Sequence, residues 1–327
     1  MAQDILTIGG AVRDITFLTE QGQIFKGKHG AEFLGFELGS KINLAGADFN
    51  LGGGACNTAV ALARLGMKTA ALVRVGADKE GEKIIEDLRA DSVETNWVQV
   101  DKNDSTGFSF ICRWNQRRNH MAFMYRGAAE KLEIKAAGLN KIKTRWLALS
   151  SLSQEDWRDD VAVLTRWVKR AGVKWAWNPG NLQLQAGAKI LKPFLKHTEI
   201  LTMNEAEAQR LVFSAEKKLT RSPRESLLAM RDWGPRLIAI TCGAKGAYLL
   251  DCQKQELIFA PGTKKKAVDA TGAGDAFFSG LTAGWDIFQE NLRRALKLAI
   301  LNSGSVVTKI GAQNGLLTAQ AIKKYFK

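Results

Sequence analysis

The apolar positions of the second half of the chain recur as short runs separated by longer segments with helical spacing. Runs of this kind are typical of buried strands, and their alternation with helices predicts βα units. Such an alternation favours an α/β fold with a mostly parallel sheet that is covered by helices on both faces. The candidate strands are residues 146–150, 174–178, 200–203 and 237–241.

The first half contains segments in which apolar and polar residues alternate at a period of two. Residues 106–112 and 120–125 have this pattern, and the residues at 115–119 are typical of a hairpin turn. We expect residues 13–47 and 98–126 to form one small sheet over the edge of a ligand crevice. The rest of the chain should form a single α/β body, so that residues 1–327 make one domain.

A glycine-containing turn precedes an apolar run, residues 276–285, that is typical of a buried helix. Gly272, Ala273 and Gly274 lie where the loop meets the start of this helix. The first N–H groups of a helix have no intrahelical partner and carry partial positive charge, so such a turn can bind a phosphate. Asp275 could either cap the helix or take a proton from a substrate hydroxyl.

A second glycine cluster lies at 52–54, before a helix that we expect to end at Gly66. Asn57 near the start of that helix could bind a polar ligand or could merely cap the helix. Asp14 follows the strand 5–8, at a place where a parallel sheet presents side chains to a crevice.

Polar residues also follow the other predicted strands. Because ligands bind beyond the carboxyl ends of parallel strands, these residues should gather at one crevice. They are Ser150, Asn178, Asn204, Thr241 and Asp269.

The chain carries 47 Lys and Arg against 33 Asp and Glu, a formal charge of +14. A basic protein can bind nucleic acid. The basic residues are nevertheless dispersed, and the densest groups, Lys264–Lys266 and Arg117–Arg118, are short and not interleaved with aromatic residues. We therefore expect anionic small ligands rather than nucleic acid.

The apolar runs are too short to span a membrane, and the N-terminus has no basic region typical of a signal peptide. The four cysteines lack the spacing of a metal site, so we expect reduced thiols. A cytoplasmic location is the corresponding expectation.

Four of these segments, in this order, resemble motifs of the ribokinase, or PfkB, family of carbohydrate kinases. Residues 269–275 resemble its C-terminal signature and residues 51–59 its N-terminal glycine-rich signature. Residues 204–207 resemble its N-x-x-E motif, and residues 241–247 its nucleotide-binding turn. The resemblance covers nearly the whole chain and implies a ribokinase-like fold with a small β-sheet lid.

The resemblance also implies roles for individual residues. Asp275 would be the general base, and Gly272, Ala273 and Gly274 would bind the transferred phosphoryl group. The residues implied for substrate binding are Asp14, Gly52, Gly53, Asn57 and Arg126. Those implied for nucleotide binding are Asn204, Thr241, Gly243, Gly246 and Thr271. Glu207 would order Mg²⁺ through water. Arg126 could also be a simple surface cation after a strand. The sequence departs from the family before Asp14, because Ala11-Val12-Arg13 lacks the asparagine that often precedes the substrate aspartate, and Arg13 beside Asp14 is unexpected in a pocket for a neutral sugar.

The function implied is ATP-dependent phosphorylation of a hydroxyl group of a small sugar, with Mg²⁺ and a monovalent cation such as K⁺. A nucleoside kinase would use the same motifs, and a sugar- or nucleotide-binding regulator is the alternative outside enzymes. The sheet of the lid could also pair between two subunits, so a homodimer is a further expectation.

Overall fold

An eight-stranded sheet forms the centre of the molecule in the computed structural model, which describes residues 2–27, 32–114 and 120–326. Six neighbouring strands are parallel, and two antiparallel strands complete one edge, which confirms the predicted mostly parallel sheet. In spatial order the strands are β16 (Glu256–Pro261), β15 (Gly246–Asp251), β14 (Leu237–Thr241), β13 (Ile200–Asn204), β12 (Lys174–Trp177), β11 (Thr144–Leu149), β1 (Gln3–Ile8) and β6 (Thr69–Leu72).

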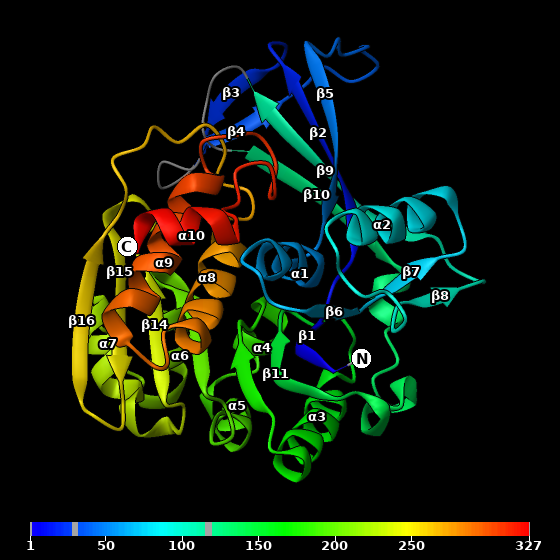
Figure 1. Ribbon diagram of the computed structural model, residues 1–327. Coiled ribbons are helices and arrows are strands. Elements are labelled where there is room, and N and C mark those ends of the chain that lie inside the picture. The colour runs from blue at the N-terminus through cyan, green and yellow to red at the C-terminus, as the bar shows by residue number, and fades with distance from the viewer. Residues whose placement is uncertain (1, 28–31, 115–119, 327) are drawn as a thin grey trace.

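Helices cover both faces of this sheet (Figure 1). Successive strand residues point to opposite faces, so Ile5 and Trp146 belong to one apolar cluster and Leu6 and Leu147 to the other. The first cluster is closed by α1 (Gly54–Arg64), α8 (Ala273–Ile287), α9 (Leu292–Val306) and α10 (Ala319–Tyr325). The second is closed by α3 (Trp157–Ala171), α4 (Asn181–Gln185), α5 (Ala188–Leu195), α6 (Glu205–Glu216) and α7 (Pro223–Met230).

Helix α8 is buried all round at its centre, as its continuous apolar run predicts. Gly280 and Gly284 of this helix face α9, where a Cβ atom on either glycine would lie under 3.0 Å from a Cα atom of that helix. The two glycines therefore let α8 and α9 pack closely, which fixes the N-terminus of α8 at the carboxyl ends of the central strands.

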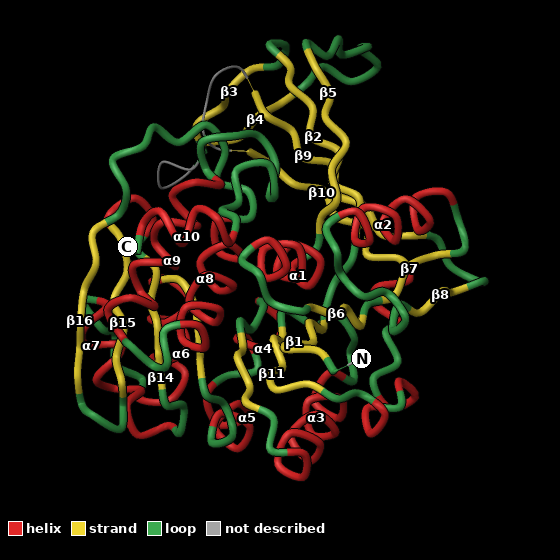
Figure 2. The backbone as a smooth tube through the Cα atoms, viewed as in Figure 1, coloured by secondary structure: helices red, strands yellow, loops and turns green. Residues whose placement is uncertain are grey.

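A separate four-stranded sheet rises from the body (Figure 2). Its strands, in spatial order, are β10 (His120–Gly127), β9 (Thr106–Trp114), β2 (Val12–Thr19) and β5 (Gly46–Gly52). We call this the small sheet. β2, β9 and β10 agree to within one residue with the expected segments 13–47 and 98–126, whereas β5 lies mostly beyond residue 47.

The small sheet does not include everything expected of residues 13–47 and 98–126. β3 (Gln23–Lys26) pairs only with β4 (Glu32–Gly35), and β8 (Gln99–Asp101) pairs with β7 (Arg74–Gly76). β8 does not join the small sheet because Gln99 donates its N–H to the carbonyl of Val73. This hydrogen bond begins the pairing of β8 with the body. The turn expected at residues 115–119 lies outside the described residues.

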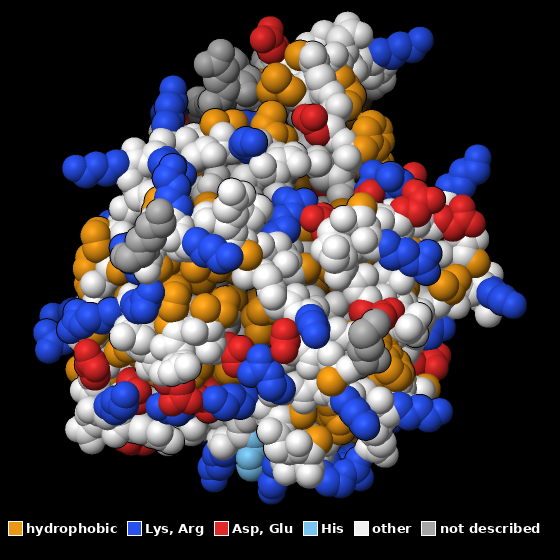
Figure 3. Space-filling model, viewed as in Figure 1, with side chains coloured by type: hydrophobic (Ala, Val, Ile, Leu, Met, Phe, Trp, Pro, Cys, Tyr) orange, Lys and Arg blue, Asp and Glu red, His pale blue; other side chains and the backbone are white. Residues whose placement is uncertain are grey.

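The positive charge is spread over the surface. In the space-filling view, Lys and Arg side chains are scattered around the visible face rather than gathered in one stripe (Figure 3). Many are paired with carboxylates, as Arg145 is with Asp4 and Asp286. Among the described residues, no helix is both long and apolar enough to cross a membrane.

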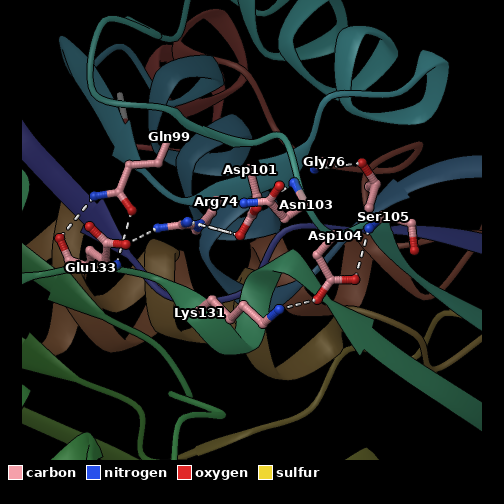
Figure 4. Close-up of polar contacts among 10 residues, drawn as sticks. Arg74, Gly76, Gln99, Asp101, Asn103, Asp104, Ser105, Lys131 and Glu133 are labelled. Atoms are coloured by element: carbon pink, nitrogen blue, oxygen red, sulfur yellow. Dashed lines mark hydrogen bonds and ion pairs between the residues drawn. The ribbon is translucent and has the colours of Figure 1, made fainter.

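A polar network fastens the base of the small sheet to the body (Figure 4). Arg74 of β7 donates to Asp101 at 2.8 Å and to Glu133 at 2.7 Å. Asp104 accepts from Lys131 at 3.0 Å and from the Tyr125 hydroxyl of β10 at 3.0 Å. These bonds join β7, β8 and the end of β10, so the small sheet leaves the body from a fixed point.

Asp78 makes the second fastening. Its carboxylate caps α2 (Lys79–Ala90) by accepting from Gly81 N, and also accepts from the N–H and hydroxyl of Thr106 at 2.7 and 2.6 Å. These three hydrogen bonds hold the pKa of Asp78 below its ordinary value, against the opposing effect of desolvation. One side chain therefore holds the start of a helix against the first residue of β9.

Candidate active site

Asp275 lies in the first turn of α8, where the turn before the helix brings it to the carboxyl ends of the central strands. The residue before the helix is Gly272, with φ of 73°, and a Cβ atom there would lie 2.4 Å from Ala312 Cβ. A glycine is therefore required at this position. The cap of α8 involves no side-chain hydrogen bond, so the interpretation of Asp275 as a helix cap is wrong.

The Asp275 side chain is half-buried and accepts a hydrogen bond from Asn57 Nδ2 at 2.9 Å. Burial raises its pKa to about 6; the hydrogen bond from Asn57 lowers the pKa and the charge of Asp14 raises it. A carboxylate whose pKa is near neutral can accept a proton and later release it. The arrangement suits a general base.

Asn57 is held by two partners and does not cap α1. The residue before α1 is Gly53, at φ 90°, and makes no side-chain cap. Asn57 Oδ1 accepts from Gln313 Nε2 at 2.9 Å, which leaves its amide nitrogen to face Asp275. Gln313 also donates to Leu51 O, so it joins the glycine cluster to the C-terminal loop. The sequence did not identify Gln313 as part of the site.

Asp14 lies on β2, with its carboxylate directly over Gly52, where any side chain would collide with it at 2.3 Å. Burial raises its pKa to about 6, although a hydrogen bond with Ser109 of β9 acts in the opposite direction. Arg13 points to the other face of the small sheet and pairs with Glu80 and Asp87 of α2 at 3.0 Å each. Arg13 therefore does not enter the site.

A cavity of about 600 Å³ opens at the carboxyl ends of β11 to β14. We call it the larger cavity. It brings together six of the predicted site residues, and Ser150 and Asn178 as well. The six are Arg126, Asn204, Glu207, Thr241, Gly274 and Asp275.

Some predicted residues lie outside that lining. Asp14, Gly52, Gly53 and Asn57 are grouped on the side of Asp275 that Asn57 contacts. Asp269 is different: it accepts from the N–H and hydroxyl of Thr271 and from Gly311 N, which lowers its pKa against the effect of burial. Asp269 and Thr271 thus shape the turn before α8, and neither lines a described cavity.

A smaller cavity, of about 220 Å³, adjoins the larger one and shares Thr241, Gly274 and Phe277 with it. It contains the predicted residues Gly243 and Gly246. Lining residues that the sequence did not identify come from the loop before α8, from α9 and from the residue that follows α9: Thr263, Lys265, Ile300, Ser303, Gly304 and Val307. Gly304 could have indicated this site from the sequence, because a glycine inside a helix often marks a place where another segment comes close to the helix. A Cβ atom on Gly304 would lie 2.3 Å from Thr263 Oγ1.

Asn204 and Glu207 form a capping box at the start of α6. Asn204 Oδ1 accepts from Glu207 N at 2.9 Å, and Glu207 Oε2 accepts from Asn204 N at 2.8 Å. Both residues line the larger cavity. No group of three metal-binding side chains occurs in the described part of the chain. A single carboxylate of this kind fits Mg²⁺ that keeps most of its waters, and not a metal held by a protein cage.

Comparisons with known proteins agree with this architecture. Residues 31–319 match the pfkB family carbohydrate kinase. The chain is 26% identical to ribokinase from Haemophilus influenzae over 87% of this chain and 90% of that protein. It is 28% identical to the bifunctional ribokinase/ribose-5-phosphate isomerase A of Fructilactobacillus sanfranciscensis over 83% of this chain, but it spans only 48% of that protein.

A solved structure extends the likeness to the fold. Arabidopsis thaliana ribokinase, complexed with ribose and ATP, aligns with a TM-score of 0.81 at 21% identity, covering 100% of this chain and 99% of that one. The family match spans most of the sequence, and the observed sheet, helices and small sheet agree with the fold that the motifs imply. The chain therefore belongs to the pfkB family of carbohydrate kinases.

Proposed function

We propose that the protein transfers the γ-phosphate of ATP to a hydroxyl group of a small sugar. The observation that carries this proposal is Asp275: a half-buried carboxylate with pKa raised to about 6 faces a cavity at the glycine turn of α8. That turn also borders the smaller cavity, which suits a nucleotide. A base, an anion-binding turn and two joined cavities are the parts that phosphoryl transfer to an alcohol requires.

At this turn the γ-phosphoryl group would pass from the bridging oxygen of ATP to the oxygen of the alcohol. The Asp275 carboxylate takes the proton of the alcohol as the alcohol oxygen bonds to the γ-phosphorus. The bond from that phosphorus to the bridging oxygen breaks, and its electron pair leaves on ADP. The N–H of Ala273 already donates to Ala270 O at 3.2 Å, which leaves the N–H groups of Gly272 and Gly274 to stabilise charge on the transferred group.

The smaller cavity would take the nucleotide. Ile300, Val307 and Phe277 give it apolar walls suited to a flat base, whereas Lys265 and Thr241 suit the phosphates. Asn204 and Glu207 would hold Mg²⁺ through its waters, where the ion supplies charge neutralisation at the phosphates. Thr271 would act only by supporting the turn, since its hydroxyl donates to Asp269. We also propose that the loop that ends at Gly311 binds a monovalent cation.

The alcohol would be held by Asp14 and Asn57, which between them accept and donate hydrogen bonds as vicinal hydroxyls require. Gly52 and Gly53 would allow it close to the backbone. Arg126 would reach it from the small sheet, which would act as a lid. Arg126 lines the larger cavity and is half-buried there, which favours this role over that of a surface cation.

A screen of ADP release over sugars and nucleosides tests the proposed function. We expect Mg²⁺-dependent ADP release with one or a few sugars. Preferential turnover of nucleosides would make the protein a nucleoside kinase on the same fold. Nucleotide and sugar binding without any turnover would support a regulator and contradict the proposal.

We further propose a cytoplasmic homodimer joined through the small sheet. Ile15, Phe49, Phe110 and Phe123 are neighbours across its four strands, on the face opposite Asp14. Phe49 and Phe123 are 63% and 61% exposed, more than aromatic side chains usually are in a monomer. Light scattering should give twice the mass of the chain, and Phe123→Asp should give the monomer; a wild-type monomer would contradict the proposal.

A further inference from the structure

Ser150 carries a buried hydroxyl at the larger cavity, and the reaction proposed above does not use it. It follows β11, is only 2% exposed, and is held in place because its N–H donates to Ile8 O at 2.9 Å. Its Oγ has no hydrogen-bond partner among the described residues, yet the residue lines the cavity. A buried hydroxyl without a partner is costly, so its place on a cavity wall points to a ligand.

Gly54 locates the atoms that Ser150 faces. The position that a Cβ atom of Gly54 would occupy lies 3.4 Å from Ser150 Oγ and 3.5 Å from Asp275 Oδ1. Both oxygens therefore border one small space above the first residue of α1. The other Asp275 oxygen, Oδ2, already accepts from Asn57, so Oδ1 is the oxygen that can take a proton in this space.

We propose that this space receives the reacting hydroxyl, an inference that rests on the proposed function. The hydroxyl donates its proton to Asp275 Oδ1 and accepts a hydrogen bond from Ser150 Oγ, which leaves its second lone pair for the phosphorus. Ser150 is then a substrate-positioning residue. Gly54 is needed because a methyl group at this position would fill the space of the hydroxyl.

The variant Gly54→Ala tests the space directly. Gly54 does not have a positive φ, and the closest contact of the new methyl group would be 3.2 Å, to Ser150 Cβ, which a small shift relieves. Alanine is favoured over glycine in helices, so the variant should keep the wild-type melting temperature. We expect its kcat/KM for the sugar to fall by roughly 10- to 100-fold, as for a misplaced nucleophile that has lost one or two hydrogen bonds. ATP affinity, measured calorimetrically with a non-hydrolysable analogue, should not change.

Ser150→Ala and Thr58→Val form a matched pair. Each removes a buried hydroxyl that has no partner among the described residues, but Thr58 lies outside the described cavities. Ser150→Ala should lower kcat/KM for the sugar by about 3- to 10-fold, the effect of one neutral hydrogen bond. Thr58→Val should leave it unchanged.

The outcomes separate this inference from the proposed function. Wild-type sugar kinetics in both Gly54→Ala and Ser150→Ala, in a protein that does phosphorylate a sugar, would overturn the acceptor space alone. A loss of ATP affinity equal to the loss of sugar affinity would also overturn it, because the space would then belong to the nucleotide. A wild-type protein that phosphorylates no alcohol would overturn the proposed function and this space together.

Discussion

At the scale of single residues, Asp275 decides whether the site is catalytic. Asp275→Asn keeps the shape of the side chain and an oxygen that can accept from Asn57, but it cannot take a proton. Turnover should fall by roughly 10²- to 10⁴-fold, the usual contribution of a positioned general base. Nucleotide affinity should be kept, because the backbone donors of the turn remain. The measurements are kcat with the best sugar and the affinity for an ATP analogue.

Asp160→Asn is the matched control for this variant. Asp160 is a buried carboxylate whose pKa is likewise raised to about 6 by desolvation, but it accepts a hydrogen bond from Gln154, away from both cavities. Its replacement should leave turnover unchanged. If Asp275→Asn turns over like the control, Asp275 has no part in the reaction.

The raised pKa of Asp275 also predicts two opposite responses to pH. Activity needs the carboxylate, so kcat/KM should fall tenfold per pH unit below about pH 6, with Asp14 titrating in the same range as part of a coupled pair. Stability responds in the other sense. Protonation favours the folded state, so the contribution of Asp275 is most favourable below the unfolded pKa of 3.8 and is lost as pH rises to about 6.

Asp275→Asn should therefore melt higher than wild type at pH 8 and at the same temperature near pH 4. About two pKa units correspond to about 3 kcal/mol of unfolding free energy at most. Denaturant titrations at the two pH values measure the difference. A constant difference between the variants at both pH values would contradict a raised pKa in the folded protein.

The residues that could be predicted from the sequence are those that belong to contiguous motifs. Asn57 and Asp275 lie in two glycine-rich segments far apart in the chain, and the structure joins them by a hydrogen bond. Ser150 was expected at the crevice only as one of five polar strand ends, and Gln313 carries no local signal, because a glutamine in a loop is ordinary there. Their positions depend on how α9 and β11 pack, which periodicity alone does not specify.

At the scale of elements, the apolar runs predicted the parallel strands because each is buried on both faces. The apolar residues at 69–76 are typical of one strand, but the segment divides between β6 and β7. Its partner changes at Val73, whose carbonyl accepts from Gln99. β15 was missed because it directly follows the turn at Gly243 and pairs antiparallel with β14, outside the βα alternation. In both cases the pairing partner, not the local pattern, sets the element.

Asp78 provides a test of how the small sheet is attached. Asp78→Ala removes the cap of α2 and leaves the Thr106 N–H without its partner. We expect a loss of about 2–4 kcal/mol in unfolding free energy, from one cap and one unsatisfied buried donor. The KM for the sugar should also rise, because β9 and β10 carry Ser109 and Arg126 to the site. Denaturant titration and sugar kinetics measure the two effects.

The control for this variant is Asp156→Ala. Asp156 occupies the same position before α3, but its side chain makes no cap hydrogen bond. Its replacement should change stability by less than about 0.5 kcal/mol, as for an ordinary surface site. Equal effects of the two substitutions would show that the Asp78 hydrogen bonds do not hold the small sheet. The pKa of Asp78 is lowered, so its contribution should be present above its unfolded pKa of 3.8 and be lost as pH falls further.

At the scale of the whole molecule, the net charge of +14 raises the question of nucleic acid again. The structure leaves the basic residues dispersed, and the densest described group, Lys264 to Lys266, adjoins the smaller cavity, which Lys265 lines. These lysines are exposed, so they can attract the phosphates of ATP by long-range electrostatics. A protein built to bind duplex DNA would instead present a continuous basic surface along many phosphates.

This difference predicts weak DNA binding that salt removes. If three lysines contact three phosphates, affinity for a labelled duplex should fall by about 40-fold between 50 and 200 mM salt, since each contact releases about 0.9 counterion. Fluorescence anisotropy of the labelled duplex measures this slope, and a duplex of scrambled sequence should give the same curve. Lys265→Ala should reduce the salt dependence of DNA binding by the amount expected for about one phosphate contact. It should also raise the KM for ATP, because Lys265 lines the smaller cavity. Binding that discriminates between the two duplexes at physiological ionic strength would mean that the charge serves DNA, and the small-ligand explanation would be wrong.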